Sequence, residues 1–286
     1  IGLCFPFVTL ITAFANLFGL GGAPLCAMAR GKGNREGAQG IMVNAGFMLL
    51  LSGAVLTVLG IAFHRPLLYL FGASEVTYPY ASSYIVIYLI GTLCVMLSLG
   101  LNPYINCQGF ARTGMLTVAL GAAANIVLDP IFIFALHLGV RGAAIATVLS
   151  QFLSAAWVVK FLTGKKAELK LDFRGFRPDW HCIQRITVLG IASFVMSFTD
   201  TLVQVACNAT LRNFGGDLYI SVMTVLNSVR QIAQTPVLAI ADGASTAISY
   251  NYGARLYRRT RDAIQFMTQI AIVYTLLVWI LVSLFP

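Results

Sequence analysis

Five long stretches of this chain contain no Lys, Arg, Asp or Glu, and they constrain its fold more than any other feature. The stretches cover residues 1–29, 37–64, 76–111, 142–159 and 263–286. A helix of about 20 apolar residues is long enough to cross the hydrocarbon core of a bilayer. Only 10% of all residues are charged, whereas 58% are hydrophobic. The sequence therefore predicts an all-α polytopic membrane protein, with the lipid bilayer as its main partner.

Eight transmembrane helices are predicted from these stretches and from shorter apolar segments between them. Their approximate bounds are 3–29, 38–63, 80–105, 113–136, 142–163, 184–208, 218–250 and 262–285. The seventh is too long for one straight crossing, and we expect Pro236 to kink or tilt it. The longest polar segment, residues 163–185, separates two groups of spans. We interpret residues 164–183 as a cytoplasmic linker between an N-terminal part, 1–163, and a C-terminal part, 184–286.

Lys and Arg are distributed unequally between the two ends of the predicted helices. The loops after the odd-numbered spans hold 15 of the 19 basic residues, and the opposite loops hold 3. Basic loops remain on the cytoplasmic side of a membrane, so we place the first set there and both chain ends outside. This topology accounts for the net charge of +9, and a nucleic-acid partner is not predicted. The six cysteines show no metal-binding spacing, so no metal site is predicted.

One carboxylate, Asp129, lies inside an otherwise apolar stretch. Asn125 precedes it by four residues, which places both side chains on one face of a helix, and Pro130 is expected to kink that helix. If residues 138–141 form a hairpin, Asp129 and Thr147 both lie roughly 9–12 Å below the same membrane face. A carboxylate, an amide and a hydroxyl together form a site for a proton or a small cation. The alternative is an acid that is hydrogen-bonded between helices for structure alone.

Three further charged residues, Asp200, Arg230 and Asp242, lie within the predicted spans of the C-terminal part. An Arg in the membrane is costly unless it is paired or hydrated, and Asp200 is its expected partner. Asp242 is twelve residues from Arg230, a rise of about 18 Å, which is too far for direct pairing. The set is interpreted either as an ion pair that fixes helix packing or as a second polar site that faces a cavity.

A weak internal repeat relates the two parts with an offset of 222 residues. It aligns Gly21 with Gly243 and Gly31 with Gly253, each pair in a small-residue stretch before a basic loop. Six spans separate the copies, so both run in the same direction. Such parallel repeats are related by an axis along the membrane normal.

The sequence resembles the multidrug and toxic compound extrusion (MATE) transporters, in particular the DinF-like and MepA-like bacterial exporters. Four segments carry the resemblance: NCQGFARTGML, NIVLDPIFIF, GVRGAAIATVLSQ and ISYNYGA. The resemblance implies twelve helices in two six-helix lobes around a central cavity. This chain would supply the second to the ninth helix, as an internal fragment that lacks the first helix of one lobe and the last three of the other.

The resemblance also implies functional residues. Asn125, Asp129 and Thr147 match the family's cation site in type and spacing, and Asp200 lies where relatives carry an acid on the seventh helix. The chain departs from the family at Asn106, where relatives often have Arg, and in its DGAST segment, residues 242–246.

The expected function is therefore secondary active antiport. Entry of H⁺ or Na⁺ would drive the export of amphipathic or cationic drugs and metabolites across the bacterial plasma (inner) membrane, without a cofactor and as a monomer. A lipid-linked saccharide flippase of the same superfamily is the alternative. An enzyme is not expected, because the three histidines lie near span ends and form no cluster.

Overall fold

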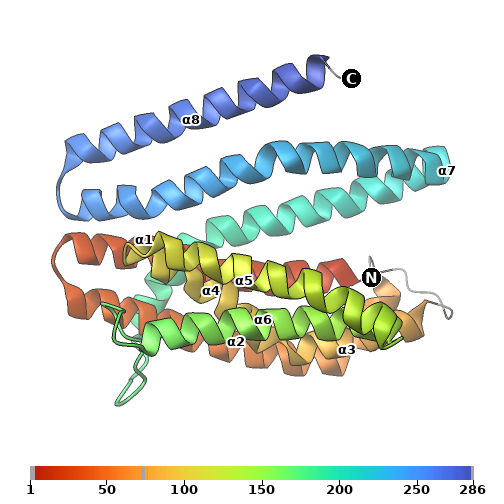
Figure 1. The fold of residues 1–286 in the computed structure, drawn as a ribbon, viewed down its shortest axis with the longest axis horizontal. Helices are drawn as coiled ribbons and strands as arrows, with labels where there is room; N and C mark the ends of the chain where they lie inside the picture. The colour runs from red at the N-terminus through yellow and green to blue at the C-terminus, as the bar shows by residue number, and fades with distance from the viewer. Residues whose placement is uncertain (1–3, 72–74, 76, 285–286) are drawn as a thin grey trace. The chain divides into compact units, whose positions relative to one another are not determined.

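The computed structural model describes residues 4–71, 75 and 77–284, and helices dominate these residues, with no strand among them. The helices follow one another along the chain as labelled in Figure 1. They are α1 (Phe5–Gly31), α2 (Arg35–Leu70), α3 (Tyr78–Ile90), α4 (Thr92–Cys107), α5 (Ala111–Pro130), the π-helical segment η2 (Ile131–Ala135), α6 (Gly139–Thr163), α7 (Trp180–Gly253) and α8 (Tyr257–Leu284). The all-helical prediction is confirmed for this part of the chain.

Six stretches of helix within the described residues are long and apolar enough to cross a membrane. They are Phe5–Gly31, Arg35–Tyr69, Ala111–Ala135, Gly139–Thr163, Trp180–Asp200 and Tyr257–Leu284. The pair α3 and α4 adds a seventh if it is counted as one span. The predicted span 218–250 is not among them, so the number eight stays a prediction.

The predicted span 80–105 is not one helix. It consists of α3 and α4, which meet at a 55° bend around Gly91. A Cβ atom at Gly91 would lie 2.6 Å from Cγ2 of Val148 on α6. Only a glycine therefore fits this contact, and the break in the helix coincides with the point where the chain is pressed against α6.

Helix α7 corrects a second expectation, that a non-helical connection separates the spans 184–208 and 218–250. Helical structure continues without interruption over all 74 residues. A straight helix of this length would measure about 111 Å, several times the thickness of a bilayer. Figure 1 shows that the ribbon of α7 instead turns back on itself.

The chain divides into two compact units, each described here by itself. Unit 1 comprises Ile1–Cys26 and Arg35–Phe198, and unit 2 comprises Ala27–Asn34 and Thr199–Pro286. These bounds differ from the predicted division at 164–183, because the first residues of α7 pack within unit 1. In unit 1, α6 packs against α3, α4 and α5, and α2 packs against α3 and α4. Tyr104, fully buried at the centre, donates a hydrogen bond of 2.8 Å to the carbonyl of Phe18.

The segment interpreted as a linker is docked onto unit 1. Ala167, Leu169 and Leu171 are buried, whereas the charged residues that alternate with them are exposed. The backbone N–H of Leu169 donates to Oε1 of the buried Gln108 at 2.9 Å, and that of Asp179 donates to Oδ1 of Asn44 at 3.0 Å. Side chains alternate between the two faces of an extended segment, so each apolar side chain here faces the rest of unit 1. We call residues 164–183, which are docked in this way, the strap.

The two turns that the predicted internal repeat pairs, from α1 to α2 and from α7 to α8, have the same backbone hydrogen bonds. The backbone hydrogen bonds of the first turn run from Lys32 to Met28, from Gly33 to Arg30 and from Asn34 to Ala29. Their counterparts, 222 residues later, run from Ala254 to Tyr250, from Arg255 to Tyr252 and from Leu256 to Asn251. Gly33 and Arg255 both have positive φ, 76° and 59°, and the next helices begin at the equivalent Arg35 and Tyr257.

Candidate functional site

The predicted hairpin exists and joins α5 to α6. Pro130 ends α5, and the chain continues as the π-helical segment η2, in which Leu136 N donates to the carbonyl of Ile131, five residues back, at 2.9 Å. Proline cannot donate a backbone hydrogen bond, and π-helical turns often occur at functional sites. The turn at 136–138 includes His137 with φ 52°, and α6 begins at Gly139. The turn thus begins two residues earlier than predicted.

Asn125 and Asp129 contact each other on the last turns of α5. Nδ2 of Asn125 donates to Oδ1 of Asp129 at 3.3 Å, and both side chains are half-buried. A distance of 3.3 Å lies beyond the usual range for N–H···O bonds, so this bond is weak. The carboxylate therefore keeps most of its capacity to accept a proton or to ligate a cation.

Thr147, on α6, lies near a residue that the sequence did not single out. The Thr147 hydroxyl donates to the carbonyl of Ala143 at 2.9 Å, and the hydroxyl of Tyr84 on α3 lies close enough to interact with it. Tyr84 is buried, and its hydroxyl is close enough to Asp129 for the two groups to interact electrostatically. Tyr84 thus lies near both predicted parts of the site, Thr147 and the Asn125–Asp129 pair.

The four side chains bring together one carboxylate, one amide and two hydroxyls, supplied by α3, α5 and α6. Oxygen ligands of this kind suit a proton or a hard cation. Within the described residues, no group of three His, Cys, Asp or Glu side chains has the geometry of a metal site. With one carboxylate, the cluster suits a singly charged ion better than a divalent metal.

The three charged residues predicted to form a second polar site are spread along one helix. Asp200, Arg230 and Asp242 all lie on α7 within unit 2, and each is exposed. Among the residues that the structure describes, no ion pair joins Asp200 to Arg230, so the predicted pairing is not seen. Asn106, the position where the family often has Arg, has its Oδ1 atom buried without a hydrogen-bond partner.

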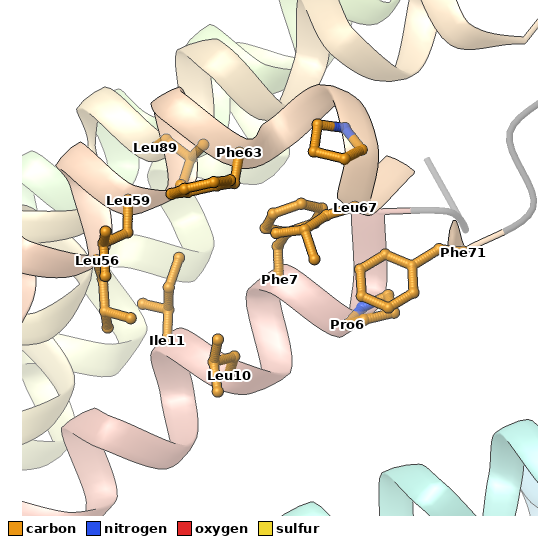
Figure 2. Close-up of a pocket in the computed structure, with 12 residues that line it drawn as sticks. Pro6, Phe7, Leu10, Ile11, Leu56, Leu59, Phe63, Leu67, Phe71 and Leu89 are labelled. Atoms are coloured by element: carbon orange, nitrogen blue, oxygen red, sulfur yellow. The ribbon is translucent and has the colours of Figure 1, made fainter. Parts of the chain in front are cut away.

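A cavity of about 490 Å³ lies elsewhere in unit 1, between α1, α2 and the end of α3. Figure 2 shows Phe7, Phe63 and Phe71 among its lining side chains. All of its lining residues are apolar apart from Gly60, and none belongs to the predicted cation site. The cavity suits a hydrocarbon group and not an ion.

Comparison with protein families gives a match over most of the chain. A family model described as MatE matches residues 1–131 and 192–286. The multidrug export protein MepA of Staphylococcus haemolyticus (strain JCSC1435) is 26% identical over 275 residues, which cover 96% of this chain and 60% of that protein. MepA of Staphylococcus aureus (strain NCTC 8325 / PS 47) is 22% identical over 265 residues, covering 93% of this chain and 58% of that protein.

Solved structures agree with this match. A crystal structure of MATE in complex with MaD3S superposes with a TM-score of 0.92 at 27% identity, covering all of this chain and 64% of that one. An outward-facing multidrug resistance MATE family transporter of the MOP superfamily gives 0.91 at 27% identity with the same coverage. The chain thus spans about 60% of the length of the relatives it matches. These relatives are transporters and not enzymes, as the sequence predicted.

Proposed function

This chain belongs to the MatE family, and from that membership we propose that its protein is a secondary active antiporter. It exports amphipathic or cationic drugs and metabolites from the cytoplasm in exchange for H⁺ or Na⁺. The names of the MepA relatives, multidrug export proteins, support the direction and the substrate class. The apolar helices support an integral protein of the bacterial plasma membrane, and we propose that it acts as a monomer with its basic loops in the cytoplasm.

The observation that carries the proposal is the cluster of Asn125, Asp129, Thr147 and Tyr84. A carboxylate inside the membrane is expensive to keep charged, and a bound proton or sodium ion neutralises it. An ion can drive transport only if it binds one conformation better than the other. The cluster is drawn from three helices, α3, α5 and α6, so a small shift of one helix changes how many ligands surround the ion.

The experiment uses the full-length protein that contains this chain, purified and placed in lipid vesicles. A proton gradient and a sodium gradient are imposed separately, and movement of a fluorescent cationic dye against its own gradient is measured. We expect one of the two gradients to drive dye movement, and dissipation of that gradient with an ionophore to stop it. Dye movement that depends on neither the proton gradient nor the sodium gradient would overturn the proposal of antiport. Transport of a lipid-linked saccharide without dye movement would favour the flippase alternative.

A further inference from the structure

Helices α1 and α4 pack closely against each other within unit 1. A Cβ atom at Gly19 would lie 2.8 Å from the carbonyl oxygen of Gly100, so a larger residue would push the two helices apart. Helix backbones approach this closely where small residues face each other. Side chains that face each other further along the same two helices are therefore held near one another by the backbones.

Two cysteines meet further along this contact. Cys26 lies seven residues after Gly19 on α1, about two helical turns. On α4, Cys107 lies the same number of residues after Gly100. The Cys107 thiol donates a hydrogen bond to the sulfur of Cys26 at 3.2 Å, and the Cys26 thiol donates to the carbonyl of Ala38 at 3.5 Å. A disulfide bond of about 2.05 Å would need the two sulfur atoms to approach by roughly 1 Å.

We propose that Cys26 and Cys107 are a redox modification site, at which a peroxide converts two thiols into one disulfide. One sulfur first takes an oxygen atom from hydrogen peroxide and becomes a sulfenic acid, and one water molecule leaves. The second thiol then forms the S–S bond and displaces that oxygen as a second water molecule. In total the O–O bond and two S–H bonds break, and two electrons pass from the sulfur atoms to the peroxide oxygens. Cellular thiols return these electrons by thiol–disulfide exchange.

The location of the pair suits a disulfide that forms only under oxidative stress. With the proposed topology the end of α4 lies on the cytoplasmic side, where thiols are normally kept reduced and disulfides are usually transient or redox-sensing. Both cysteines are buried, which slows their oxidation at rest. However, Gly109, two residues after Cys107, is exposed. Hydrogen peroxide is small and uncharged, so local opening at this end of the helix is enough to admit it.

The disulfide would also change the stability of the protein. Cys26 and Cys107 are 81 positions apart in the sequence, so a bond between them closes a long loop. Closing a long loop restricts the unfolded chain and stabilises the folded one. We therefore expect the oxidised protein to unfold at a temperature several degrees above that of the reduced protein. This expectation does not depend on the transported compound or on the coupling ion.

The test treats the full-length protein in lipid vesicles with hydrogen peroxide, blocks the remaining thiols and maps disulfides by mass spectrometry of unreduced peptides. We expect the Cys26–Cys107 peptide pair to increase several-fold and to return to background with dithiothreitol, together with the rise in unfolding temperature. Cys182 is only partly buried and reports whether peroxide has reached the protein. Oxidation of Cys182 while Cys26 and Cys107 remain thiols would overturn the proposal, and so would a disulfide of either with Cys182 in place of each other.

Cysteine variants give a second measurement. Cys26→Ala and Cys107→Ala each remove one sulfur atom, so each should abolish both the mapped disulfide and the peroxide-dependent rise in unfolding temperature. Cys94→Ala is the matched control, because Cys94 also lies on α4 and its replacement leaves both sulfur atoms in place. A temperature rise that persists in Cys26→Ala or Cys107→Ala would assign the peroxide effect to other residues and overturn the site. Gradient-driven dye export by the reduced protein tests antiport separately from all of these outcomes.

Discussion

Replacing Asp129 with Asn separates the role of its charge from the role of its hydrogen bond. The amide has nearly the same size and can still accept the bond from Nδ2 of Asn125, but it cannot take up a proton at working pH. Hydrogen bonds to charged acceptors contribute about 1.5–3 kcal/mol and neutral ones about 0.5–1.5 kcal/mol. The bond here is 3.3 Å long, which places it at the weak end of both ranges. We therefore expect Asp129→Asn to lower the free energy of unfolding by about 1 kcal/mol or less.

Asp129→Asn should lower transport far more than it lowers stability. Without a titratable or negatively charged group the cluster loses its ion, so gradient-driven dye export should fall to the level of empty vesicles. Asp129→Glu, which keeps the charge on a longer side chain, should retain part of the activity. The assay is dye efflux from vesicles with an imposed ion gradient, with expression and thermal stability measured on the same preparations. Near-normal efflux by Asp129→Asn would refute ion coupling through this residue and would favour a structural role, since an amide can also accept the hydrogen bond from Asn125.

Three further predictions concern the hydroxyl of Tyr84, the docking of the strap and the membrane topology. Tyr84→Phe removes one hydroxyl from the cluster and should raise the ion concentration needed for half-maximal export several-fold, with maximal export little changed; an unaltered ion dependence would remove Tyr84 from the site. Gln108→Leu leaves the N–H of Leu169 without its buried acceptor, so thermal unfolding should show a loss of about 1–3 kcal/mol and proteases should cut the strap faster, whereas unchanged proteolysis would contradict this role. Cysteines introduced at Gly164 and at Gly139 should react with membrane-impermeant reagents only from the cytoplasm and only from outside, respectively, and labelling of both from one side would refute the proposed topology.

The helices and the α5–α6 hairpin could be predicted because they depend on local sequence. A charge-free apolar run has few alternatives to a membrane helix, and the four-residue spacing of Asn125 and Asp129 fixes their common face. Tyr84 could not be predicted, because it lies far from Thr147 in the chain and comes near it only after folding. In an apolar run, a tyrosine at a binding site also looks the same as one that only packs in the core. The bend at Gly91 was missed for a similar reason, since its partner Val148 lies on another helix.

The sequence of the strap contains a local pattern of alternating residues, but the high content of Lys and Arg around it obscured this pattern. Between Ala167 and Asp172 apolar and charged residues alternate strictly, a pattern that favours an extended segment with one buried face. The abundance of Lys and Arg around it favoured instead the interpretation as a cytoplasmic linker. The sequence does not show that Gln108, just after α4, and Asn44, on α2, supply buried acceptors for the strap, because the three segments meet only after folding.

The two equivalent turns show that one backbone geometry can be built from different side chains. They share the same three backbone hydrogen bonds, yet position by position their side chains have almost nothing in common, and at the left-handed position Gly33 is matched by Arg255. A left-handed conformation is strained for most residues and free of strain for glycine, so the second copy has kept the geometry without the residue best suited to it. The two halves therefore share the path of the backbone at these turns and the glycine that precedes each turn, Gly31 and Gly253, while the neighbouring side chains differ.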